Sequence, residues 1–304
     1  MKETSSSSNL TEEKLLNEVP ELPSFWDDLV LITKARLTFL VVITTALGYC
    51  LAARTSFNWL EFIQTLIGTG FVAAGAAVFN QLIEIQEDQI MRRTQDRPLA
   101  AGRMGKVMAF CLGMGFGLVG TVHLALAVNI FAAALALGTL LIYVLVYTPL
   151  KRKSSTCTLV GAVSGAIPPM VGWVAGGRGL DAGAWYLFGV LFFWQLPHFL
   201  SINWIYREEY EKAGFVMWSN NDESGEVSAK LSFWFSLALL LWTVLALPKD
   251  FTSTFVIIGV GICGLAMLWY SIRFLRKPHL ESARGVFFCS LIYLPIVLAV
   301  LVFS

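Results

Sequence analysis

Long apolar runs recur along the whole chain, and they constrain its fold more than any other feature. Each is roughly 18–25 residues long, enough to cross a hydrocarbon layer of about 30 Å as a helix. They lie at 31–53, 60–82, 106–126, 128–147, 157–175, 183–205, 230–247, 252–272 and 283–303. Only 14% of the residues are charged, against about 25% in soluble domains, and the mean hydropathy is +0.67. The sequence therefore predicts an integral membrane protein with nine spans.

The spans are predicted to be helices, which makes the fold all-α. Strands of a membrane barrel would be about 10 residues long with alternating polarity, whereas these runs are longer and uniformly apolar. Residues 29–304 are expected to form one transmembrane domain. Residues 1–28 are polar and rich in Ser and Glu, so we expect a disordered cytoplasmic tail there. The five cysteines are scattered without a C-x-x-C pair, which favours a packing role for them.

The basic residues predict the orientation of the spans. Counting crossings places nineteen of the 22 Lys and Arg residues on the side of the N-terminus. The other side has only Arg54, Arg178 and Lys249. Loops that stay in the cytoplasm are enriched in Lys and Arg, so the N-terminus is expected in the cytoplasm and the C-terminus outside. We expect the membrane to be the bacterial plasma (inner) membrane.

A first polar cluster follows the second run. Asn80, Glu84, Asp88 and Arg92 recur at every fourth residue, which places them on one face of a helix that is expected to end at Pro98. An amide and two carboxylates in such a row are hard oxygen ligands of the kind that Mg²⁺ prefers. Ordinary charges at a helix end are the alternative, but Asn80 and Glu84 directly continue an apolar run, where ionisable groups indicate function.

A second polar cluster follows the sixth run, on the same predicted membrane face. The run ends in Trp-Gln-Leu-Pro-His-Phe, residues 194–199, and the carboxylates Glu208 and Glu209 come soon after. The predicted catalytic residues are Asn80, Glu84, Asp88, Glu208 and Glu209, and the predicted Mg²⁺ ligands are Asn80, Glu84, Asp88 and Glu209. The predicted diphosphate-binding residues are Arg92, Arg93, Arg97, Lys151, Arg152 and Arg207. For Lys151 and its neighbours, a topology signal is an equally good explanation.

This combination indicates a substrate with a diphosphate head and a long apolar tail. Mg²⁺ ions between the two clusters would be bridged by the diphosphate, with Arg and Lys on its other oxygens. The tail would lie among the helices. Ionisation of the allylic C–O bond would then leave a carbocation for an electron-rich partner.

At these residues the chain resembles a known family. The segment Asn80–Asp88, with Met91, Arg93-Thr94 and Arg97-Pro98-Leu99 after it, is similar to the first signature of the UbiA-type intramembrane aromatic prenyltransferases. More narrowly, it looks like that of the protoheme IX farnesyltransferases, also called haem O synthases. The resemblance continues through residues 147–152, 161–169, 172–173, 194–199 and Tyr210-x-x-Ala-Gly-x-x-Met217. It covers roughly residues 30 to 300.

The resemblance implies nine helices around a central cavity, Mg²⁺ as cofactor, farnesyl diphosphate as donor and the vinyl group of haem B as acceptor. The products would be haem O and diphosphate. It also implies haem A synthase or terminal oxidase assembly factors as partners, and no nucleic acid. The family often has Asp where Glu84 and Glu209 stand, which keeps the charge but lengthens the side chain. Cys157 stands where a polar residue is expected, so no role is assigned to it.

His198 lies within a predicted span, directly after a proline. We predict contact with haem, through its iron or a propionate, and the alternative is a hydrogen bond between helices. Two other functions remain open for the chain. The same fold could prenylate a quinone-precursor ring, which residues 147–152 and 194–199 argue against. A secondary transporter could use the acidic residues for cation coupling, but clusters on one membrane face favour a parallel duplication over the inverted repeats of many transporters.

Overall fold

The computed structural model describes residues 23–303, and helices long and apolar enough to span a membrane lie within them at all nine predicted places. In chain order the spans are α3 (Ala35–Ala52), α4 (Trp59–Ile83), α6 (Lys106–Ala127), the series α7 (Ile130–Leu141), η1 (Ile142–Tyr147) and α8 (Thr148–Leu150), the pair α9 (Cys157–Ala166) and α10 (Pro168–Ala175), α11 (Ala182–Ile205), α13 (Glu226–Leu245), α14 (Thr254–Arg276) and α15 (Leu280–Val302). The shorter elements are α2 (Phe25–Ile32), α5 (Ile85–Ile90), α12 (Arg207–Lys212) and η2 (Lys249–Phe251). The all-α prediction is confirmed.

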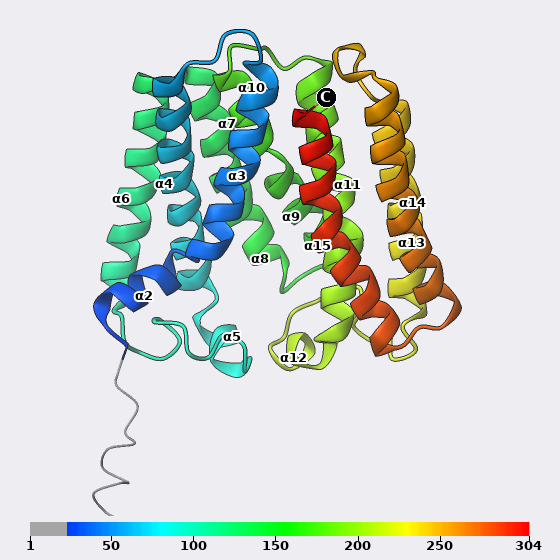
Figure 1. The fold of residues 1–304 in the computed structure, drawn as a ribbon. Helices are drawn as coiled ribbons and strands as arrows, with labels where there is room; N and C mark the ends of the chain where they lie inside the picture. Colours follow the sequence, from blue (N-terminus) through cyan, green and yellow to red (C-terminus); the bar gives the residue numbers. More distant parts are fainter. Residues whose placement is uncertain (1–22, 304) are drawn as a thin grey trace, which may run out of the picture.

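The spans stand side by side with their axes roughly parallel (Figure 1). The short helices α2, α5 and α12 gather at one end of the bundle, and the C-terminus lies at the other end. The odd number of crossings in the described part of the chain accounts for this arrangement. The two polar clusters therefore lie at the same end, as the crossing count predicted.

The fifth span, formed by α9 and α10, is the most buried of the spans in the described residues. It breaks at Ile167, because Pro168 and Pro169 have no backbone N–H with which to continue the helix. Its second half packs closely on α3. A Cβ atom on Gly172 would lie 1.8 Å from the carbonyl oxygen of Thr45, so only glycine allows the two helices to approach this closely.

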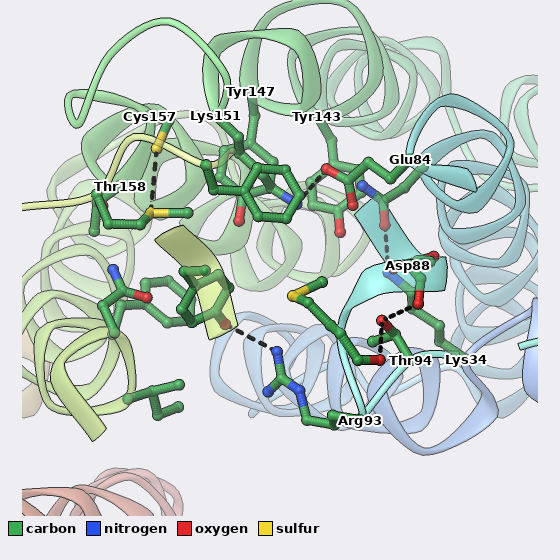
Figure 2. A pocket seen from close by; sticks show the side chains of 18 of the residues that line it. Lys34, Glu84, Asp88, Arg93, Thr94, Tyr143, Tyr147, Lys151, Cys157 and Thr158 are labelled. Atoms are coloured by element: carbon green, nitrogen blue, oxygen red, sulfur yellow. Dashed lines mark hydrogen bonds and ion pairs between the residues drawn. The ribbon is translucent and has the colours of Figure 1, made fainter. Parts of the chain in front are cut away.

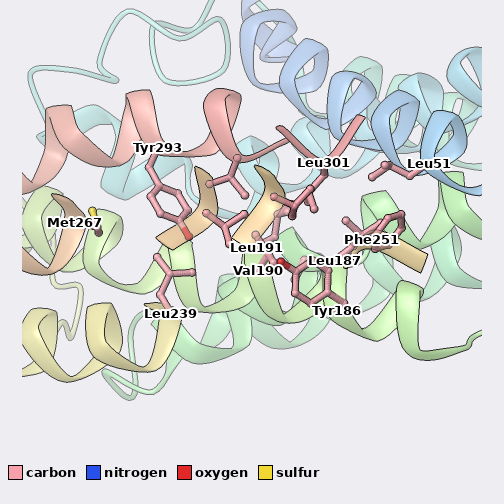
Figure 3. Close-up of a cluster of buried hydrophobic side chains, with 14 of the residues drawn as sticks. Leu51, Tyr186, Leu187, Val190, Leu191, Leu239, Phe251, Met267, Tyr293 and Leu301 are labelled. Carbon is pink, nitrogen blue, oxygen red and sulfur yellow. The ribbon is translucent and has the colours of Figure 1, made fainter. Parts of the chain in front are cut away.

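A large apolar cluster fills the half of the bundle formed by α11, α13, α14 and α15 (Figure 3). Tyr186, Leu239 and Tyr293 are among its buried members. Lipid tails are as apolar as these side chains, so close packing and hydrogen bonds between helices, more than exclusion of water, stabilise this half. The Tyr186 hydroxyl, for example, donates to the carbonyl oxygen of Thr243 at 3.0 Å.

Helix α2 corrects the predicted boundary of the N-terminal tail. Ser24 and Asp27 form a capping box that starts the helix at Phe25, within the segment expected to be disordered. Asp28 is buried and pairs with Arg103 at 2.8 Å, which fixes α2 to the loop before α6. Residues 25–28 are thus helical and belong to the folded domain. The rest of the predicted tail, residues 1–22, lies outside the described residues.

Candidate active site

The first polar cluster lies at a break between two helices. Helix α4 ends at Ile83 and α5 runs only from Ile85 to Ile90, so the prediction of one helix up to Pro98 is wrong. Glu84 caps both helices, and its backbone N–H still bonds to the Asn80 carbonyl at 3.1 Å. The next i to i−4 bond, from Asp88 to Glu84, is 2.8 Å long. The row of polar side chains thus survives the break as far as Asp88.

Glu84 and Asp88 point into a cavity of about 210 Å³ at this end of the bundle (Figure 2), and Asn80 lines the same cavity. Asn80, Glu84 and Asp88 are 0%, 3% and 1% exposed. Charged groups so deeply buried are destabilising unless they are paired. The surroundings of the two carboxylates therefore decide what the cavity can bind.

Each carboxylate has a cationic partner from another part of the chain. Lys151 Nζ lies 2.6 Å from Glu84 Oε1, and Arg97 Nη1 lies 2.7 Å and 2.8 Å from the two oxygens of Asp88. Burial lowers the pKa of the Lys151 ammonium, but Glu84 and its other neighbours outweigh this and raise that pKa above its usual value. Lys151 is thus a permanent cation in the cavity.

Lys34 is a third cation in the cavity, and its position in the sequence indicated only a contribution to the orientation of the spans. It precedes α3 in a left-handed backbone conformation with φ of 47°, and its ammonium donates to the Asn80 side-chain oxygen. Burial, and then the positive charges of Arg97 and Lys151, lower the pKa of Lys34 to about 7. Added negative charge would favour its protonated form. No spacing in the sequence indicates that Lys34 meets Asn80.

The other predicted diphosphate-binding residues lie in different places. Arg93 lines the cavity and donates to the Tyr210 hydroxyl at 2.9 Å. Arg152 instead pairs with Glu87, at 2.7 Å, and does not line the cavity. Arg92 is exposed beyond the end of α5, and Arg207 lies over the Trp204 ring at 5.0 Å. The structure thus brings Arg93, Arg97 and Lys151 together, but not Arg92, Arg152 or Arg207.

The second cluster does not bring its carboxylates into the cavity. Glu208 is exposed and Glu209 half-buried on α12, and neither lines it. Their assignments remain predictions. Asn203, one turn earlier on α11, does line it and is 7% exposed. No motif singled out Asn203, because an amide beside buried aromatic residues has no characteristic spacing.

The donors at the first cluster fit Mg²⁺ in number and type. Mg²⁺ usually takes one or two protein carboxylates and completes its coordination with water and substrate phosphates. Asn80, Glu84 and Asp88 supply one amide and two carboxylates to one cavity. In the described residues, no group of three or more His, Cys, Asp or Glu side chains is placed to hold a metal by itself. Water and phosphate oxygens of the substrate would complete the coordination of Mg²⁺ at these donors.

A second, mostly apolar cavity of about 250 Å³ adjoins the first. Tyr143, Tyr147 and Phe199 line both. Tyr143 and Tyr147 lie on the π-helical turn η1, a wide turn often found at functional sites, and their ring centroids are 5.1 Å apart. Gly161, Ser164 and Gly165 of α9 form part of the apolar wall. The polar end of the bundle thus continues between the helices as an apolar space.

His198 lines neither cavity. It lies on α11 and faces α15, where its Nδ1 is 2.7 Å from Ser290 Oγ. The hydrogen bond between helices that was the alternative reading is therefore present. The predicted contact with haem remains a prediction.

The chain is similar to known proteins in sequence and in fold. The model of the UbiA prenyltransferase family matches residues 41–292. The chain belongs to this family. It is 40% identical, over 94% of its length and 97% of the relative's, to protoheme IX farnesyltransferase of Opitutus terrae (strain DSM 11246 / JCM 15787 / PB90-1). The protein of that name from Solibacter usitatus (strain Ellin6076) is 36% identical over 89% of this chain and 96% of its own. The chain is thus an enzyme of the prenyltransferase class.

Solved structures show the same fold. A structure described as that of digeranylgeranylglyceryl phosphate synthase in membranes has a TM-score of 0.78 at 18% identity, and covers 91% of this chain and 97% of its own. A UbiA homolog from Archaeoglobus fulgidus, bound to GPP and Mg²⁺, has a TM-score of 0.68 at 14% identity, with coverage of 90% and 99%. At these identities the likeness supports the fold alone.

Proposed function

We propose that this UbiA-family enzyme transfers the farnesyl group of farnesyl diphosphate to a vinyl group of haem B, giving haem O and diphosphate with water added. The observation that carries the proposal is the pair of joined cavities, one lined by paired charges and the other apolar. A diphosphate head fits the first and a prenyl chain the second. The name shared by the curated relatives supports farnesyl as the group and protoheme IX as the acceptor.

The donor head would change the partners of the buried charges. Lys151 and Arg97 now neutralise Glu84 and Asp88. Phosphate oxygens would take over both cations, since Arg and Lys bind phosphate as readily as carboxylate. Lys34 would supply a further positive charge beside Asn80. The two carboxylates would then be free to act as ligands.

Mg²⁺ bound by Asn80, Glu84 and Asp88 would neutralise the leaving diphosphate and so favour ionisation of the allylic C–O bond. The protein's own residues do the rest. Arg97 and Lys151 hold the departing oxygens, and the rings of Tyr143 and Tyr147 line the place where head and chain meet. Aromatic faces attract positive charge, so these rings would stabilise the allylic cation.

The acceptor needs more room than a single aromatic ring does. Gly161, Ser164 and Gly165 of α9 present little side chain to the apolar cavity, so we propose that the acceptor approaches the prenyl chain on this side. A leucine at position 165 must displace the Gln195 side chain, which would lie 2.0 Å from its Cβ, and would narrow this approach. Gly165→Leu should therefore block haem turnover, while the contacts of the diphosphate head in the charged cavity are kept. Binding of the donor and formation of haem O measured on the same preparation separate the two effects.

The decisive experiment offers haem B and 4-hydroxybenzoate separately to the purified protein with farnesyl diphosphate and Mg²⁺. We expect prenylated haem and no prenylated benzoate. Prenylation of the benzoate alone would exclude haem B as the acceptor and leave the broader prenyltransferase function. Omission of Mg²⁺ should stop the reaction. Failure to release diphosphate from any donor would instead favour the transporter.

We also propose that the end of the bundle with the charged cavity faces the cytoplasm of a bacterial cell. Nineteen of the 22 basic residues lie on that side by the crossing count. Reporter fusions after Lys153 and Lys230 should report cytoplasm, and fusions after Arg178 and Ser304 the outside. A cytoplasmic reporter at Ser304 would contradict this orientation.

A further inference from the structure

The imidazole of His198 is held firmly between two helices. It stacks with Trp194, one turn earlier on α11, and with Phe287 on α15, at centroid distances of 5.3 Å and interplanar angles of 20° and 28°. Trp194 is fixed in turn, because its indole N–H donates to the carbonyl oxygen of Ser290 at 2.7 Å. Two nearly parallel rings thus restrict rotation of the imidazole.

The hydroxyl of Ser290 determines which imidazole nitrogen carries the hydrogen. Ser290 Oγ lies 2.5 Å from the carbonyl oxygen of Phe287 and 2.7 Å from His198 Nδ1. A carbonyl oxygen only accepts, so the one hydroxyl hydrogen belongs to the bond with Phe287. Ser290 Oγ must then accept from Nδ1–H. The other nitrogen, Nε2, therefore keeps its lone pair.

Nothing in the described part of the chain uses that lone pair. No residue there hydrogen-bonds to Nε2, and Nε2 is not among the enclosed polar atoms that lack a partner. It is therefore not fully enclosed by the protein, on a side chain that is half-buried. A neutral imidazole whose Nδ1–H is held by a neighbour, while Nε2 stays free, is the usual arrangement of a metal-binding histidine. An ionisable side chain within a membrane span suggests a function by default.

We propose that Ser290 is a positioning residue that sets His198 to bind the iron of the haem B substrate through Nε2. This rests on the proposed function, because it takes haem as the acceptor. Phe199 connects this ligand to the reaction site. Its ring lies 5.6 Å from that of His198 and also lines both cavities. Haem bound at His198 thus lies next to the space proposed for the prenyl chain.

The test is haem binding by the purified full chain. Ferric haem B is titrated into wild type and variants, followed by Soret absorbance and by electron paramagnetic resonance of the axial ligand. Ser290→Ala should weaken binding by about 10- to 100-fold and alter the histidine signal, as is typical when a group that orients a metal ligand is lost. Ser290→Thr keeps the hydroxyl and should behave like wild type. His198→Ala should lose the signal, and adding Ser290→Ala to it should change nothing further.

A matched control is available in the same half of the bundle. Ser236 Oγ is 2.7 Å from Ser271 Oγ in the buried contact of α13 with α14, so Ser236→Ala also removes a hydrogen bond between helices. It should leave haem binding unchanged. Donor affinity reports folding, since neither Ser290 nor His198 lines the charged cavity. If Ser290→Ala fails this check, Ser290→Cys replaces it, because a thiol keeps the volume but accepts hydrogen bonds weakly.

The outcomes separate the proposal from the proposed function. A wild-type affinity and spectrum in Ser290→Ala, with both lost in His198→Ala, overturns the role of Ser290. A wild-type spectrum in His198→Ala shows that the iron is bound elsewhere and overturns the whole proposal. Neither result bears on the transfer of farnesyl to haem, which fails only if wild type forms no prenylated haem.

Discussion

The two polar clusters look alike in sequence and differ in the structure. The first, around Glu84 and Asp88, is buried, and both carboxylates pair with cations from elsewhere in the chain. In the second, Glu208 and Glu209 form no salt bridge within residues 23–303 and lie outside the cavity. Buried charges are destabilising and are retained only where something compensates them. The first cluster is therefore the better candidate for a binding site.

The difference also shows that the second region contributes by other means. It supplies Asn203, Tyr210, Phe215 and Met217 to the wall of the cavity. These are one amide and three large side chains, which shape the cavity and give it little charge. The contact of Tyr210 with Arg93 joins the two regions. The first cluster thus supplies the charged side chains of the site, and the second region supplies mostly uncharged side chains of its wall.

The largest expected effect is that of Asp88→Asn. It removes the charge of a proposed metal ligand while keeping its shape, and should lower kcat by roughly 10²- to 10³-fold, as loss of a group that stabilises developing charge does. Glu208→Gln makes the same chemical change on the exposed α12 and should be near wild type. Glu84→Asp keeps the charge and should retain substantial activity. The turnover of farnesyl diphosphate is measured for all three variants. Near-normal turnover in Asp88→Asn would contradict the assignment of the first cluster.

A smaller effect is expected from the cations that pair with these carboxylates. Lys151→Ala and Arg97→Ala should each raise the KM for farnesyl diphosphate by roughly 10- to 100-fold, since bonds to charged groups contribute about 1.5–3 kcal/mol. Arg207→Ala, on the second cluster, is the matched control and should leave KM unchanged. Arg97→Lys keeps the charge but loses the bidentate contact, so its KM should lie between those of wild type and Arg97→Ala. An unchanged KM in both alanine variants would mean that Lys151 and Arg97 contribute to the orientation of the spans and do not bind the diphosphate.

Glu209→Gln tests how far the second cluster takes part in the chemistry. Glu209 is half-buried beside the cavity, and Arg93 feels its charge. We expect kcat to fall by about 3- to 10-fold, which corresponds to a contact of about 0.5–1.5 kcal/mol. The expected order of loss is therefore Asp88→Asn, then Glu209→Gln, then Glu208→Gln. If Glu209→Gln is as damaging as Asp88→Asn, α12 closes over the substrate and both clusters hold the metal.

The sequence predicted what depends on local pattern. Apolar runs predicted the spans, and the spacing of Asn80, Glu84 and Asp88 predicted that their side chains lie along one face. It did not predict the helix break at Glu84, which no Gly or Pro marks. Nor did it predict the meeting of Lys34 with Asn80, which are 46 residues apart. Contacts between distant helices depend on how the whole bundle packs, and a single sequence holds no local signal for them.

The smallest expected effect concerns the contact that joins the two regions. Tyr210→Phe removes only the hydroxyl that accepts from Arg93, while Arg93 keeps its place over the Tyr206 ring, at 5.4 Å. The bond is exposed, so its loss should raise the KM for the donor by about two- to threefold, or about 0.5 kcal/mol. Arg93→Ala also removes a cation from the cavity and should have the larger effect. If Tyr210→Phe instead raises KM as much as Arg93→Ala does, the main role of Arg93 is to hold Tyr210 in place. Its charge would then contribute little to binding the diphosphate.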